Sequence, residues 1–174
     1  MNWTLPRFFF SILLLSLFPA TVVGTDVLRM DFGGGWEFGY EHEEPGYFIL
    51  EYVPTGQTID NWSHLLTFQG FAVHTKPHRI TLRNKVERLE KRMRTRCKNT
   101  IWKVLWEKED RVIYEWRVFR CPEVESQAEI AAFIAGNSTL FRTAYTLKTK
   151  NGMGRGDRNW WERVFLDAEV IQED

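Results

Sequence analysis

The sequence predicts an α+β domain in which helices pack on an antiparallel sheet of about five strands. Apolar residues alternate with a period of two in several segments, short turns join neighbouring segments, and other segments carry an apolar stripe at helical spacing. In chain order the segments predict strand, strand, helix, helix, strand, strand, helix, strand and helix. We expect one domain at residues 25–174, because about 150 residues suit a single buried core.

Residues 1–24 have the three parts of a secretory signal peptide. Arg7 precedes the apolar run Phe8–Phe18, which spans about eleven residues, whereas a membrane-spanning helix needs about 20. Val22 and Gly24 then suit positions −3 and −1 of a cleavage site before Thr25. An uncleaved anchor or a buried helix is the alternative. We expect a soluble protein, secreted or periplasmic, with no transmembrane segment after cleavage.

The first strands are predicted at Trp36–Tyr40 and Tyr47–Val53, because the turn signal Pro45-Gly46 lies between them. Two helices are predicted next, the first opening near Thr58 or Asp60 and the second at His78–Arg96. The first helix rests on the helical spacing of Trp62, Leu65, Leu66 and Gln69, and the second on that of Leu82, Val86, Leu89 and Met93.

Ile101–Glu107 and Val112–Arg120 both alternate as strands and are predicted to pair as a hairpin. The register that puts their apolar residues on one face sets Trp102 opposite Trp116, Val104 opposite Tyr114 and Trp106 opposite Val112. Extended to the open end, this register brings Cys97 opposite Cys121. Two cysteines in an exported chain then indicate a disulfide, since the CxxC spacing of a redox or metal site is absent from the sequence.

The remaining segments predict a helix, a strand and a final helix. Glu125–Ala135 is interpreted as a helix that ends at Gly136, and Ser138–Lys148 alternates as a strand. Asp157 is expected to cap the last helix, whose buried stripe is formed by Trp161, Val164, Phe165 and Ala168.

The segment Tyr52–Gly70, YVPTGQTIDNWSHLLTFQG, resembles a motif of small exported bacterial proteins of unassigned function. In that motif a strand ends in V-P-x-G-Q and a helix opens with N-W-x-x-L. The resemblance implies a periplasmic or secreted setting and brings no activity with it. In topology the predicted elements are also similar to the PsbP/Mog1 type of sandwich, an analogy of fold that implies no function.

Arg79–Lys98 is the most distinctive chemical feature, with nine Lys or Arg against two Glu on a predicted helix. Such a helix is suited to anions such as phospholipid head groups, an envelope polymer or an acidic protein, and the alternative is a solvated face balanced by acids elsewhere. Nucleic acid is not the expected partner, because the 23 basic and 23 acidic residues give a net charge of zero. The candidate binding residues are Arg83, Lys85, Arg88, Lys91, Arg92 and Arg94.

Trp160 lies off the apolar stripe of the last helix and is a candidate aromatic contact. No metal or cofactor is expected: His74 and His78 are four residues apart, but Pro77 disfavours a helix between them. The adjacent Ser63 and His64 lack the local signature of a catalytic triad. The sequence therefore predicts a binding module without catalytic residues, with a small secreted hydrolase whose site is assembled from distant residues as the alternative.

Overall fold

The computed structural model describes residues 25–173, which form nine strands and two helices. The signal peptide predicted at residues 1–24 lies outside the described residues. The strands are β1 (Thr25–Arg29), β2 (Trp36–Glu44), β3 (Tyr47–Pro54), β4 (His64–Ala72), β5 (Ile101–Glu107), β6 (Arg111–Val118), β7 (Gln127–Ala135), β8 (Thr139–Lys148) and β9 (Glu169–Glu173). The helices are α1 (Arg79–Arg96) and α2 (Arg155–Asp167), and neither has the length and apolar content needed to cross a membrane.

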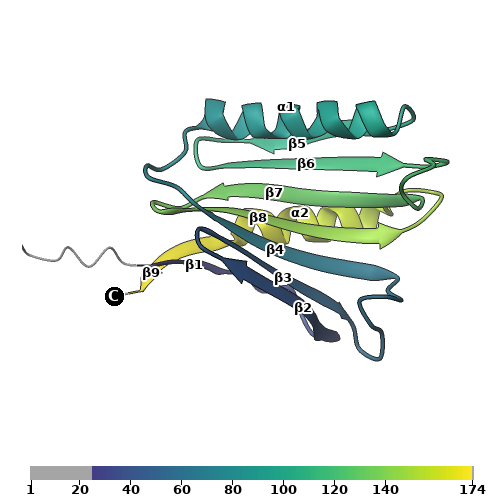
Figure 1. Cartoon of the computed structure of the whole chain (residues 1–174), viewed down its shortest axis with the longest axis horizontal. Helices are drawn as coiled ribbons and strands as arrows, with labels where there is room; N and C mark the ends of the chain where they lie inside the picture. Colours follow the sequence, from purple (N-terminus) through teal and green to yellow (C-terminus); the bar gives the residue numbers. More distant parts are fainter. Residues whose placement is uncertain (1–24, 174) are drawn as a thin grey trace, which may run out of the picture.

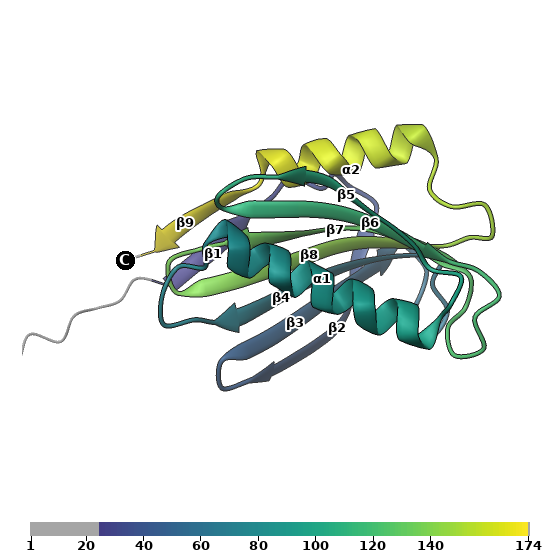
Figure 2. The ribbon, with the colours of Figure 1, turned by 90° about the horizontal axis from the view of Figure 1, so that it is seen from above.

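The described residues build one large sheet with a helix on each face. Seven strands pair in the order β2-β3-β4-β8-β7-β6-β5, and every neighbouring pair is antiparallel (Figure 1). Seen from above, α1 and α2 lie on opposite faces of this sheet (Figure 2). β1 and β9 form a separate antiparallel pair that joins Thr25 to Glu173, so the two ends of the described chain lie side by side.

Each face of the sheet has its own apolar core. On the α2 face, Trp161 and Phe165 pack against strand residues such as Leu66 and Ile130. On the α1 face, Leu82 and Val86 pack against the inner residues of β6 and β7. A fully buried side chain of this size contributes about 1.5–3 kcal/mol to folding, so both helices are fixed mainly by these contacts. Because α1 lies over β6, the same face of β4, β3 and β2 is left open.

The predicted α+β fold with about five strands is wrong, because the described chain is mostly antiparallel β. Tyr52–Gly70 does not open a helix at Asn61-Trp62: the chain enters strand β4 at His64 instead. Leu66 and Phe68 face the α2 core, while Phe71 faces the α1 core, so both faces of β4 carry apolar residues. This distribution produces the apolar spacing that we interpret from the sequence as a helix.

The helix predicted at Glu125–Ala135 is also wrong, since Gln127–Ala135 is the strand β7. β7 lies inside the sheet with a helix-covered core on each face, so its residues from Ala128 to Ala135 are all buried. An unbroken apolar run of this kind does not separate a buried strand from a buried helix. Gly136 ends no helix: it lies next to Asp26, where an added Cβ would come 2.5 Å from the carboxylate oxygen Oδ2.

The other predicted elements are confirmed, and β1 and β9 are additions. The first hairpin is β2–β3, the predicted helix at His78–Arg96 is α1, and the last helix is α2. Asp157 does not cap α2 as predicted: the helix begins at Arg155 after Gly154, and Asp157 lies in its first turn. In the β5–β6 hairpin, Trp102 lies opposite Trp116 and Val104 opposite Tyr114, as predicted. A bulge between Val104 and Trp106 then shifts the register, so Trp106 lies opposite Ile113 and not Val112.

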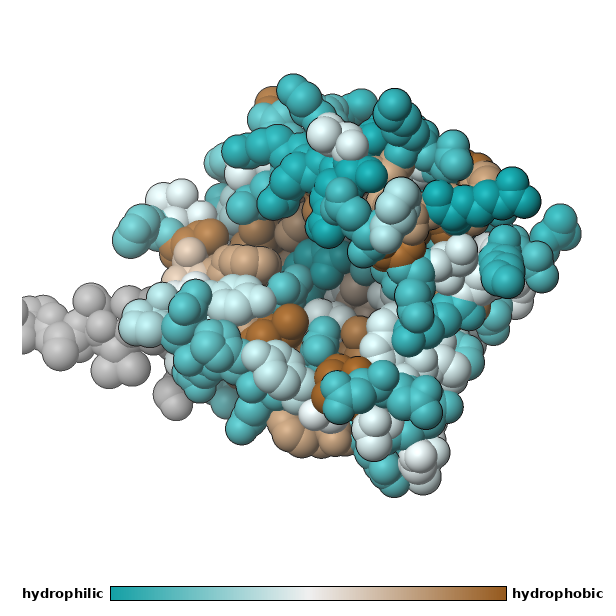
Figure 3. Space-filling view, turned by 45° about the vertical axis from the view of Figure 1, so that its right-hand side comes forward, coloured by the Kyte–Doolittle hydropathy of each residue, from teal (hydrophilic) through white to brown (hydrophobic). Residues whose placement is uncertain are grey.

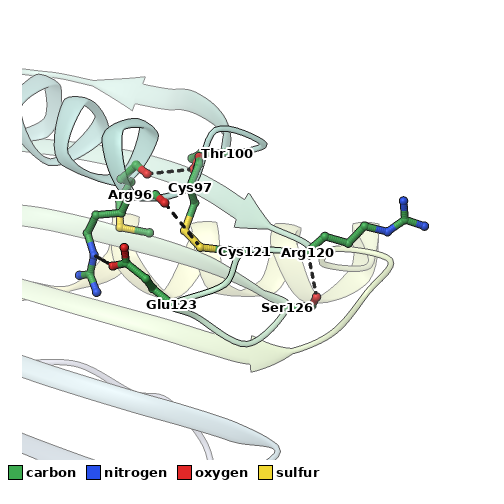
Figure 4. Close-up of a disulfide and its surroundings, with 8 residues drawn as sticks. Arg96, Cys97, Thr100, Arg120, Cys121, Glu123 and Ser126 are labelled. Atoms are coloured by element: carbon green, nitrogen blue, oxygen red, sulfur yellow. Dashed lines mark hydrogen bonds and ion pairs between the residues drawn. A yellow bond between two sulfur atoms is a disulfide. The ribbon is translucent and has the colours of Figure 1, made fainter.

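The predicted disulfide between Cys97 and Cys121 is present, with the two Cα atoms 5.3 Å apart (Figure 4). It links the residue that follows α1 to the loop after β6, beyond the ends of the hairpin strands. Arg96 adds an ion pair to Glu123 over 3.0 Å beside the bridge, as Figure 4 shows. The C-terminal end of α1 is therefore held to the sheet covalently.

Candidate anion-binding groove

A groove of about 1070 Å³ lies between α1 and the neighbouring face of strands β4, β8 and β7. The sheet side of the groove is formed by Gln69 and Phe71 of β4, Phe133 of β7 and Arg142 of β8. In Figure 3 the surface is hollowed below a layer of hydrophilic side chains, and apolar side chains lie inside the hollow. The helix side consists of Lys85, Arg88, Leu89, Lys91, Arg92, Met93, Thr95 and Arg96.

The base of the groove is a buried polar network centred on Arg142. Its Nη2 donates to Glu129 Oε1 over 2.6 Å, and its Nη1 donates to Gln69 Oε1 over 3.1 Å. Its Nε donates to the hydroxyl of Tyr114 over 2.9 Å. These partners come from β7, β4 and β6, so one side chain on β8 connects four strands and fixes the shape of the groove.

Burial and mutual charge set the protonation of this network. Burial lowers the pKa of Arg142, but the carboxylate of Glu129 and the hydroxyl of Tyr114 outweigh that effect and hold the pKa above its ordinary value. Burial raises the pKa of Tyr114 to about 12. The network therefore holds a charged guanidinium and a neutral phenol near pH 7, and the ion pair with Glu129 compensates the positive charge of Arg142 locally.

The structure divides the six candidate basic residues of α1 into two groups. Arg83 pairs with Glu87 and Glu107, and Arg94 pairs with Glu90. These two arginines lie outside the groove lining. The other four line the groove and make no ion pair within residues 25–173, and we call them the basic rim: Lys85, Arg88, Lys91 and Arg92.

The basic rim gives one wall of the groove an uncompensated charge of about +4 at neutral pH, where Lys and Arg are protonated. Arg96 also lines the groove, but Glu123 neutralises it. Cations beside a wall of low dielectric produce a positive potential that concentrates anions. The groove is therefore electrostatically suited to an anionic ligand.

Of the groups that general acid–base or nucleophilic catalysis uses, the described groove lining holds only Lys85, Lys91 and Thr95. Its twelve described lining residues include no Asp, Glu, His, Cys, Ser or Tyr. Across residues 25–173, no three His, Cys, Asp or Glu side chains are grouped so that they would hold a metal ion. The groove therefore offers a ligand the positive charges of the basic side chains on α1, the guanidinium of Arg142 at its bottom and an apolar surface.

Two other sequence features lie on the α2 face, away from the groove. Trp160 is 44% exposed and packs edge-on against Trp161, with ring centroids 4.5 Å apart. Its role as an aromatic contact stays a prediction. Ser63 Oγ lies 2.8 Å from Nδ1 of His64, but Gln57 also bonds this hydroxyl, and His64 stacks on Tyr145.

The sheet side of the groove was not predicted from the sequence. Glu129 and Arg142 each stand inside a segment of mostly apolar residues, and their charges are opposite. Buried charges are normally paired, so two isolated charges of opposite sign in neighbouring apolar segments are a usable signal for such a pair. Gln69 and Phe71 give no comparable signal, because the spacing of their segment predicts a helix.

Comparison with known proteins assigns the chain to no group: no family model matches it, and neither a curated protein nor a solved structure is a significant match. The resemblance of Tyr52–Gly70 to small exported bacterial proteins stays a prediction. The function of the protein is consequently inferred from the geometry of the groove.

Proposed function

We propose that the protein is an exported binding module that takes an anionic component of the cell envelope into the groove. The observation that carries this proposal is the basic rim, four cationic side chains without ion-pair partners in residues 25–173. The groove volume of about 1070 Å³ lies just above the range of about 300–1,000 Å³ that is typical of small-molecule sites. A concave site of this size favours a small ligand over the flat surface of a partner protein.

Binding is favoured over catalysis by the chemistry of the lining. A hydrolase needs a nucleophile or an activated water together with a group that moves a proton. The described lining offers only cations, apolar side chains, an amide and one hydroxyl, that of Thr95. These groups hold and orient an anion.

The disulfide supports an oxidising location for this function. Bridges such as Cys97–Cys121 form and persist in the periplasm or outside the cell and are rare in the cytosol. The predicted signal peptide points to the same compartments. In those compartments the anionic envelope molecules are lipid head groups and phosphorylated or carboxylated polymers, which the basic rim suits by charge.

The proposal is tested by titrating the purified protein with two anions, tripolyphosphate and dodecyl phosphate below its micelle concentration. We expect binding of at least one of them at about 20 mM salt that weakens strongly at about 300 mM, because ions screen exposed charges. The triple variant K85E/R88E/R92E reverses three rim charges and is expected to weaken binding at least about tenfold, since each exposed contact is worth up to about 1 kcal/mol.

The matched control is R155E/R163E, which reverses two exposed cations on α2, the helix on the opposite face. This control is expected to bind like the wild type. Failure of both anions to bind at low salt, or equal loss in the triple variant and the control, would overturn the proposal.

A further inference from the structure

The groove carries an apolar surface directly beside its basic rim. Leu89 and Met93 of α1 line the groove together with Phe71 of β4 and Phe133 of β7, and we call these four side chains the apolar floor. Arg142 of β8 lies between the two phenylalanines, because β8 separates β4 from β7. Phe133 is buried, whereas Leu89, Met93 and Phe71 are only partly buried and pack against the edge of the α1 core. Part of their apolar surface is therefore left open in the groove.

The helix arranges the two kinds of side chain in parallel rows. Lys85, Leu89 and Met93 are spaced four residues apart, and so are Arg88, Arg92 and Arg96. Residues four apart lie above one another on an α-helix, so each row runs for about 12 Å along the groove. Within these rows the apolar pair Leu89 and Met93 extends for about 6 Å beside Arg88 and Arg92, and the cationic residues Lys85 and Arg96 lie at the ends.

Only a ligand with two parts uses both rows. A hydrophilic polyanion would leave the apolar floor uncovered and would lose hydration where its charges met apolar atoms. An uncharged hydrocarbon would cover the apolar floor and gain nothing from the arginines. A molecule with an anionic head and an apolar chain places each part against its matching row.

We infer that the ligand is a single-chain lipid phosphate, an inference that rests on the proposed function. The chain lies on the apolar floor, and the phosphate is bound by the basic rim. Arg88 and Arg92 carry planar guanidinium groups, which bind phosphate through two parallel hydrogen bonds. Within residues 25–173, only four apolar side chains line the groove, an apolar surface that one chain can cover.

The test is a chain-length series of butyl, octyl and dodecyl phosphate, all kept below their micelle concentrations, with binding measured by calorimetry. Each methylene that leaves water for an apolar surface is worth about 0.8 kcal/mol when fully buried, which is about fourfold in Kd. Because the groove is open, we expect Kd to fall about twofold to fourfold per added methylene. Dodecyl maltoside, which has the chain without the charge, is expected to bind far more weakly than dodecyl phosphate.

The double variant L89Q/M93Q removes the helix side of the apolar floor. It is expected to flatten the dependence on chain length while binding remains sensitive to salt. I80Q is the matched control, because Ile80 is an apolar residue of α1 that is 70% exposed and lies outside the groove lining. If L89Q/M93Q unfolds, F71Q removes apolar surface from the sheet side and serves the same comparison.

The outcomes separate this inference from the proposed function. Salt-sensitive binding of all three phosphates with one common Kd would overturn the lipid assignment and leave anion binding in the groove intact. A chain-length dependence that persists unchanged in L89Q/M93Q and in F71Q would place the chain elsewhere and overturn the inference as well. Failure of tripolyphosphate and of every alkyl phosphate to bind would overturn the proposed function itself.

Discussion

Arg142 on β8 donates to Glu129 on β7 over 2.6 Å at the base of the groove, with side chains only 15% and 9% exposed. Trp116 Nε1 also donates to Glu129 Oε1 over 2.7 Å, and Thr146 donates to the other oxygen over 3.2 Å. The carboxylate is thus bonded through both of its oxygens. A buried ion pair is often no more stabilising than two apolar side chains of similar volume. What the pair of Arg142 and Glu129 adds is a fixed set of hydrogen bonds, which holds the base of the groove in one geometry.

Replacing Glu129 tests how much folding depends on that pair. E129Q leaves the guanidinium of Arg142 buried without its counter-charge, so we expect the free energy of unfolding to fall by about 3 kcal/mol or more. The matched control is E125Q, which breaks the exposed ion pair with Lys148 and is expected to cost less than about 1 kcal/mol. Urea denaturation of both variants gives the two losses in the free energy of unfolding. Equal losses would show that the buried ion pair contributes no more to stability than the exposed one.

Removing the disulfide is expected to destabilise the protein without changing its fold. The bridge Cys97–Cys121 closes a loop with a sequence separation of 24. A loop of that length restricts the unfolded chain by about 3.5 kcal/mol. We expect C97S/C121S to lose about this amount in urea denaturation. The double variant also serves as the control for the reducing agent, which should lower the stability of the wild type and leave that of C97S/C121S unchanged. Two thiols that can be alkylated in the native wild type would contradict the bridge.

The sequence predicted best where local signals and long-range packing agree. The β5–β6 register follows from matching apolar faces, and its extension to the open end of the hairpin correctly pairs Cys97 with Cys121. Its error begins at Leu105, where a bulge inserts an extra residue that no apolar pattern marks. The pairing of the two hairpin strands was therefore predictable from the sequence, whereas the bulge between Val104 and Trp106 was not.

The secondary structure of β4 and β7 was predicted wrongly as helix because it depends on contacts that are distant in the sequence. β7 lies inside the sheet with an apolar layer on each face, and β4 carries Leu66 and Phe68 on one face and Phe71 on the other. The period of two that marks a strand with one apolar face is therefore absent from both. Whether such a run is a strand depends on the neighbours that it meets in the fold. The basic side of the groove was visible in the sequence of α1, whereas its base required the pairing of β4, β7 and β8.

Glu51 on β3 is expected to oppose folding at neutral pH. Burial raises the pKa of its carboxyl above the ordinary value, and the hydrogen bond from Thr67 only partly offsets this effect. The charged form is therefore disfavoured in the folded state, so E51Q should raise the free energy of unfolding at pH 7. The gain should shrink as the pH falls through the raised folded pKa and should vanish below the unfolded value of about 4.3. Urea denaturation of E51Q and the wild type between pH 3 and 7 measures this difference in the free energy of unfolding. A difference that does not change with pH would contradict this explanation.

Asp26 is expected to have the opposite dependence on pH. Its Oδ2 accepts hydrogen bonds from the backbone of Ser138 over 2.6 Å, from the hydroxyl of Ser138 over 3.0 Å and from the backbone of Thr139 over 2.8 Å. Burial alone would raise the pKa of Asp26, but these bonds outweigh it and lower the pKa. The carboxylate thereby ties β1 to the turn between β7 and β8.

The contribution of Asp26 is therefore present above its unfolded pKa of about 3.9 and is lost as the pH falls through the lower, folded value. We expect D26N to cost about 2 kcal/mol at pH 7, the scale of hydrogen bonds to a charged group. The difference between wild type and variant should narrow below about pH 4. D60N, which changes an exposed aspartate in the loop before β4, is the control and should show no such narrowing. A D26N deficit that stays constant from pH 7 down to pH 2 would mean that the shape of the side chain, and not its charge, ties β1 to the β7–β8 turn.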